Sequence, residues 1–80
     1  MPRSNKLEKQ AFNSLQPEFV FVQSQSSTVW NINHSLNKFY PSVSVEDEFG
    51  EAIVGNVKAI DKNNLQIIFT IPSRGTAYLH

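Results

Sequence analysis

The residues best suited to acid–base or metal chemistry are two histidines. His34 follows Trp30 and Ile32 on one face of a predicted strand, and the second histidine, His80, is the last residue given. A zinc site needs three or four His, Cys, Asp or Glu ligands, and this chain has no cysteine. One-dimensional spacing leaves a serine–histidine–acid arrangement open, but no serine lies in a nucleophile-elbow motif. We predict no catalytic residue, no metal and no cofactor. We expect His34 to end its strand and to bond the following loop through a ring nitrogen.

Four carboxylates near two predicted turns are the other candidates for ion binding. Asp47, Glu48, Glu51 and Asp61 could supply oxygens to calcium, which takes six to eight oxygen ligands. The segment Asp-Glu-Phe-Gly-Glu lacks the regular alternation of a calcium loop. We therefore expect Asp47 to accept hydrogen bonds from backbone amides of its own turn.

Three aromatic residues, Phe39, Tyr40 and Phe49, lie in or beside predicted loops. Grouped aromatic side chains can bind sugars, stack on bases or anchor a protein interface. Base stacking calls for nearby cations, and Lys38 stands alone beside Phe39. These residues therefore favour core packing or protein contact over ligand binding.

The charge of the chain is balanced overall and uneven locally. Seven basic and seven acidic residues cancel, which removes the electrostatic footprint expected of a nucleic-acid partner. Residues 1–16 carry three basic residues and one acidic residue, whereas residues 42–61 carry one basic and five acidic. We expect a solvated tail and a solvated turn; the alternative is docking of the tail on a neighbour's acidic patch. No apolar run reaches the roughly 18 residues of a membrane span, so no membrane partner is expected.

Eighty residues predict one domain with a small core, about 60–65% of the unfolded surface being buried. A small domain without disulfides often gains stability by association. We assign residues 1–17 to a docking segment, either a short helix or extended, because Leu7, Phe12 and Leu15 form one apolar stripe. Pro17 ends this segment, and residues 18–80 form the domain.

The domain is predicted to be all-β. Residues 18–24, 28–33, 42–46, 51–60, 65–71 and 76–79 read as six short strands between turns. Gly50 is expected to be left-handed in a turn, and Gly55 to mark a bulge or a close backbone approach. This pattern predicts a small antiparallel β-sandwich, immunoglobulin-like, with a partly open barrel as the alternative.

Alternation of apolar and polar residues separates core from surface. The first strand is apolar on both faces, so both need cover. One face can lie against the domain's own core, and the other is covered either within the domain as well or by a neighbouring chain or the N-terminal segment. The predicted core residues are Trp30, Ile32, Val43, Val45, Val57, Ile67 and Phe69. The predicted interface residues are Leu7, Phe12, Leu15, Phe19, Phe21, Phe39, Tyr40 and Phe49.

Three motifs give the chain a family resemblance. They are Trp-x-Ile-x-His-x-Leu-x-Lys at 30–38, Pro-x-Val-x-Val-x-Asp-x-x-Gly at 41–50 and Gly-x-Ala-Tyr-Leu at 75–79, with a looser match around Gly55. Together they resemble a small β-domain of tailed-bacteriophage virion proteins, of the tail-fibre or tail-associated type. The resemblance runs from about Phe19 to Leu79. The loop before Pro41 is one residue longer than the pattern, and the family's domain usually belongs to a longer chain.

The resemblance implies a structural role. The chain would be a non-enzymatic assembly or attachment module of the tail, baseplate or fibre region, located in the virion and bound to other virion proteins. It would form a homo-oligomer, with a trimer as one option. The alternatives are a capsid-decorating head protein and a receptor- or glycan-binding tip.

Overall fold

The computed structural model describes residues 16–80, which form an all-β structure without a helix. The predicted docking residues Leu7, Phe12 and Leu15 lie outside the described residues. The five strands are β1 (Phe19–Asn33), β2 (Val43–Asp47), β3 (Ala52–Ile53), β4 (Asn56–Asp61) and β5 (Asn64–Leu79).

All five strands belong to one antiparallel sheet built around β5. Residues 75–79 of β5 lie between the first part of β1 and the whole of β2. Residues 64–68 lie between the last part of β1 and β4. The short β3 extends the sheet beyond β2. The last strand is therefore central, and β1 forms an edge along its whole length.

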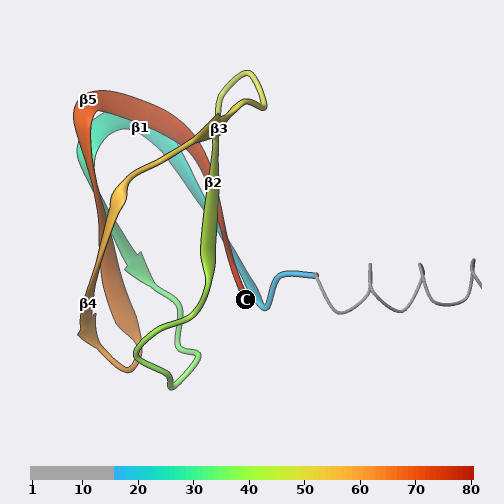
Figure 1. Cartoon of the computed structure of the whole chain (residues 1–80), viewed down its shortest axis with the longest axis vertical. Helices are drawn as coiled ribbons and strands as arrows, with labels where there is room; N and C mark the ends of the chain where they lie inside the picture. The colour runs from blue at the N-terminus through green and yellow to red at the C-terminus, as the bar shows by residue number, and fades with distance from the viewer. Residues whose placement is uncertain (1–15) are drawn as a thin grey trace, which may run out of the picture.

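The sheet bends back on itself around Trp30. Figure 1 shows β1 and β5 arching together, so that β2 and β4 descend on opposite sides of the molecule. The pairing of β1 with β5 shifts register between Gln23 and Val29, and the two strands bend at this point. The Trp30 ring lies 4.8 Å from the Phe69 ring and 6.2 Å from the Phe21 ring, centroid to centroid. Its indole N–H donates to the carbonyl of Ser73 over 3.0 Å.

The structure corrects the predicted strand count from six to five. The turns expected at residues 23–28 and 72–75 are parts of β1 and β5, because the two strands bend together and remain paired at Gln23–Gly75 and Ser27–Ser73. Serine and proline are turn signals, but Pro72 is tolerated here because it lies at the register shift. The single strand expected over 51–60 is divided into β3 and β4 at Gly55.

Most of the predicted core is confirmed. Val43 packs partly against the core, as do Phe19, Phe21 and Leu36. The buried apolar residues are Trp30, Ile32, Val45, Leu65, Ile67, Phe69, Ala77 and Leu79.

The assignment of Val57 to the core is wrong, since this side chain is 48% exposed. Val57 lies opposite the buried Ile67, which is why its position in the pattern resembles a core position. Its own strand is paired only with β5. Within residues 16–80, no further strand pairs with β4 on the side away from β5, so the Val57 side chain is left partly uncovered.

Two predicted backbone features are confirmed. Gly55 allows a close approach, because a Cβ there would lie 2.5 Å from Cγ2 of Ile67 and 2.7 Å from Cε1 of Phe69. Gly50 is left-handed, with φ of 81°. The Asp47 carboxylate accepts hydrogen bonds from the amides of Phe49 and Glu51, each over 2.9 Å, so it stabilises its own turn.

Candidate functional site

The loop of residues 34–42 joins β1 to β2 and carries three of the candidate residues, His34, Phe39 and Tyr40. Its first turns need left-handed backbone at Ser35 and Asn37, whose φ values are 54° and 57°. The amides of His34 and Ser35 donate to the carbonyl of Asn63 over 2.8 and 3.3 Å. The amide of Lys38 donates to the carbonyl of Lys62 over 2.8 Å. The loop is thus tied to the turn between β4 and β5.

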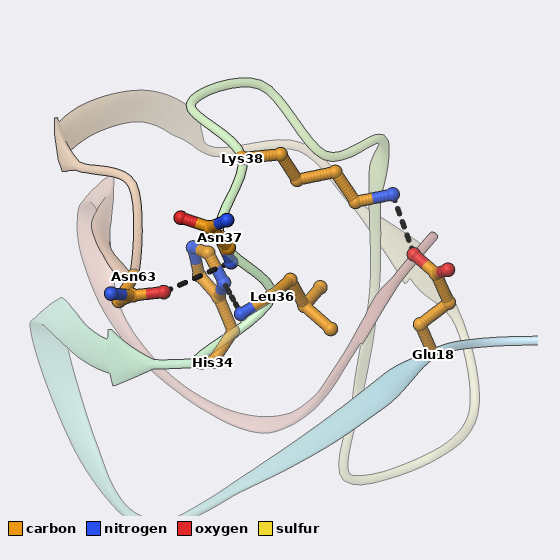
Figure 2. Close-up of polar contacts among 6 residues, drawn as sticks. All are labelled: Glu18, His34, Leu36, Asn37, Lys38 and Asn63. Carbon is orange, nitrogen blue, oxygen red and sulfur yellow. Dashed lines mark hydrogen bonds and ion pairs between the residues drawn. The ribbon is translucent and has the colours of Figure 1, made fainter.

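Asn63 is the residue of this site that the sequence did not identify. Its side-chain oxygen accepts a hydrogen bond from the amide of Asn37 over 2.9 Å (Figure 2). The backbone amide of Asn63 donates to the Asp61 carboxylate over 2.8 Å, and this bond is the main reason why the pKa of Asp61 is lowered. The side-chain amide of Asn64 donates to the same carboxylate. The asparagine-rich segment indicates a turn in the sequence, but the sequence does not show that Asn63 has a hydrogen-bond partner in the distant loop.

His34 has the structural role that the sequence predicts. The side chain is 2% exposed, and its Nδ1 accepts a hydrogen bond from the amide of Leu36 over 3.0 Å (Figure 2). An accepting Nδ1 places the proton of a neutral imidazole on Nε2. Nε2 is buried and has no hydrogen-bond partner among the described residues. Burial lowers the pKa of His34, opposed by the charge of Asp61 and assisted by that of Lys38.

The buried imidazole makes stability depend on pH. The folded pKa of His34 lies below its ordinary value of 6.5, so the unfolded chain binds more protons between these two values. Its contribution is complete above pH 6.5 and is lost as the pH falls towards the lowered pKa. We expect the urea midpoint, followed by Trp30 fluorescence, to fall between about pH 8 and about pH 5. Asp61 titrates below its ordinary 3.8 and so lies outside this window.

Two variants isolate the histidine responsible. In His34→Asn, the short carboxamide can still accept from the amide two residues on, so we expect a smaller pH slope and a loss of about 1–3 kcal/mol from the missing ring. His80→Asn is the matched control, because it removes the other imidazole and leaves the buried ring of His34 in place. An unchanged slope in His34→Asn would contradict the assignment.

An ion pair connects the loop to the start of β1. Nζ of Lys38 lies 2.5 Å from Oε1 of Glu18, and Figure 2 shows the lysine side chain reaching across to it. Both side chains are partly exposed. Exposed ion pairs contribute about 0–1 kcal/mol, so this pair orients the loop more than it stabilises the fold.

The structure brings together only two of the three predicted aromatic residues. Phe39 is 45% exposed and Tyr40 is 87% exposed, and their ring centroids lie 6.1 Å apart. Phe49 is 80% exposed in the turn between β2 and β3. This turn lies at the opposite end of β2 from the 34–42 loop (Figure 1). Any role in protein contact therefore involves two separate surfaces.

Several acidic residues have partners of their own. Glu48 pairs with Arg74 over 2.6 Å, and this hydrogen bond lowers the pKa of Glu48. The hydroxyl of Tyr78 donates to Glu46, which raises the pKa of the tyrosine. Residues 16–80 contain no group of three or more ionisable side chains arranged to hold a metal.

The first part of β1 divides its apolar side chains between two faces. Phe19 and Phe21, which we predicted at an interface, are half-buried and pack on the core. Val20 and Val22 lie on the opposite face and are 47% and 65% exposed. The exposed apolar surface of this part of β1 is therefore formed by the valines.

In the described part of the chain, no helix has the length and apolar character to cross a membrane. The chain matches no protein-family model, no curated protein and no solved structure.

Proposed function

We propose that this chain is a structural protein of a tailed-bacteriophage virion, a non-enzymatic assembly or attachment module of the tail, baseplate or fibre region. Its partners would be other virion proteins and further copies of itself. The proposal rests on the motif resemblance over about residues 19–79 together with one structural observation, the large apolar side chains that lie exposed on the domain.

That surface is distributed over the whole domain. Val54 is 94% exposed and Ile71 is 70% exposed, in addition to Tyr40, Phe49 and Val22. Scattered apolar residues are common on protein surfaces, but large aromatic side chains at both ends of a small domain are suited to anchoring contacts. A module of this kind can contact neighbours at each end, which is what an extended assembly requires.

We also propose that the bent sheet serves as a small, immunoglobulin-like β-sandwich. The two halves of the sheet would act as its two layers, with Trp30 between Phe21 of one half and Phe69 of the other. The hydrogen bond from Trp30 to Ser73 at the bend supports this arrangement, since it fixes the angle between the halves.

The deletion of residues 2–16 tests the assembly role. All five described strands lie after the deleted segment, which contains the predicted docking stripe, so the domain should fold and should unfold cooperatively in urea. We expect the shortened chain to be lost from purified particles, as measured by mass spectrometry. Particles that carry the shortened chain at wild-type level would contradict the docking role of this segment.

A receptor- or glycan-binding tip is the second candidate, favoured by the adjacent exposed rings of Phe39 and Tyr40. Paired aromatic faces are a suitable platform for a sugar ring. Tyr40→Ala should then abolish glycan-array binding, whereas Phe49→Ala, at the other end of β2, should retain it. An array without any binding to the wild-type chain would remove this candidate.

A further inference from the structure

Apart from the register shift between Gln23 and Val29, the edge of the sheet formed by β1 lacks the features that normally prevent edge strands from associating. Natural edge strands carry charged side chains, proline or bulges, or are very short. The 15 residues of β1 include no charged residue, no proline and no glycine. The other edges differ, because β4 carries Lys58 and Asp61 and β3 has only two residues. Among the described strands, β1 alone presents a long unprotected edge.

The register shift near Gln23 divides this edge into two regular stretches. Residues 29–33 expose Asn31 and Asn33 on their outer face, and both are already engaged in hydrogen bonds to Gln66 and Asn64. Residues 19–23 expose Val20 and Val22 instead. The apolar stretch is the one suited to burial against another strand.

We infer that residues 19–23 pair with the same residues of a second copy, antiparallel and across a two-fold axis at Phe21. This inference rests on the proposed function, for which it names a partner. A two-fold axis perpendicular to the sheet keeps each side chain on its own face. Residues that lie opposite each other must therefore be an even number of positions apart, so the axis lies midway between the two copies of one residue. With the axis at Phe21, Val20 lies opposite Val22 of the second copy. The exposed valines of both copies then form one apolar cluster of four.

The charges near this strand are compatible with self-association. Because β1 is uncharged, no like charges meet along the paired stretch. Glu18, the nearest charge before the strand, would lie opposite Ser24 of the second copy. The two copies of Glu18 would be six residues apart along the strands, or roughly 20 Å at about 3.3 Å per residue. At that separation their repulsion is screened in ordinary buffer.

The paired stretch is short, so the dimer is expected to be reversible and dependent on concentration. Sedimentation equilibrium of the full chain should give a monomer–dimer equilibrium. Val20→Lys with Val22→Lys places like charges opposite each other and should give only monomer. The matched control, Val54→Lys with Ile71→Lys, changes two apolar residues outside β1 that are even more exposed and should dimerise like the wild type.

Charge reversal tests the register. The variant with Val20→Glu and Val22→Glu should also be monomeric alone, but mixing it with the lysine variant should restore a dimer. Cysteine variants give a second test, since the chain has no cysteine of its own. A mixture of Val20→Cys and Val22→Cys chains should form a disulfide dimer on mild oxidation. Each variant alone should not, because its own sulfurs would be diagonal neighbours.

Three results would overturn the inference. They are a chain that remains monomeric at the highest soluble concentration, a trimer or larger oligomer, and a lysine variant that still dimerises. In the first of these cases, dimerisation that appears after deletion of residues 2–16 would assign the edge to the chain's own N-terminal segment. These outcomes are separable from the proposed function: a monomer found in particles removes the dimer alone, and a dimer absent from particles removes the virion role alone.

Discussion

Trp30→Ala is expected to leave the chain largely unfolded. The side chain is fully buried and packs against aromatic rings from both halves of the bent sheet. Removing a large buried aromatic side chain costs about 3–5 kcal/mol. A domain of this size has a total stability of roughly 4–12 kcal/mol, so the loss consumes much of it. Because this variant lacks the only tryptophan, urea unfolding should be followed by far-ultraviolet circular dichroism.

Trp30→Phe is the matched control. It keeps an aromatic ring in the core but removes the indole N–H that donates to Ser73. We expect a cooperative transition at a lower urea midpoint than that of the wild type, and a higher midpoint than any shown by Trp30→Ala. If Trp30→Ala unfolds at the wild-type midpoint, the two halves of the sheet do not depend on this side chain.

Gly75→Ala is expected to have the largest effect of the three glycine-to-alanine substitutions. A Cβ at Gly75 would lie 2.0 Å from the carbonyl oxygen of Glu46 and 2.8 Å from Cα of Asp47. Both atoms belong to the backbone of β2, so a side-chain rotation cannot relieve the overlap. The backbone φ of 156° is also one that residues with a Cβ rarely adopt. We expect a loss of about 3 kcal/mol, measured by urea unfolding with Trp30 fluorescence.

Gly50→Ala is the comparison for this variant. Its φ of 81° is unfavourable for alanine, but the nearest atom to a Cβ would be a carboxylate oxygen of Glu46 at 3.6 Å. Only the backbone strain remains, about 1–2 kcal/mol. Equal destabilisation by the two variants would mean that the contact between Gly75 and β2 adds nothing beyond backbone strain.

The local features of the fold could be predicted because each is encoded by neighbouring residues. The turn at Asp47 depends on an acidic residue and a glycine three positions later. The bond from the Leu36 amide to His34 spans two residues, and alternation identifies Trp30 and Ile32 as core. None of these needs knowledge of which strand pairs with which.

The features that the sequence did not predict correctly all depend on pairing between distant parts of the chain. Polar residues such as Ser24 and Ser27 indicate a turn when read alone, yet they continue β1 because β5 bends alongside. The exposure of Val57 follows from the edge position of β4, and alternation cannot distinguish an edge from a centre. The role of Asn63 required its placement beside Asn37, 26 residues earlier in the chain.

The central position of β5 has a consequence for synthesis on the ribosome. Phe19 pairs with Leu79, so the first strand must wait for the last before its hydrogen bonds can form. Folds dominated by such non-local pairing form slowly, and their nascent strands remain open to misassembly. During this delay, the neutral, valine-rich start of β1 is available to other newly made chains. Under the proposed pairing of residues 19–23, copies that are translated close together would associate through this segment before β5 has been made.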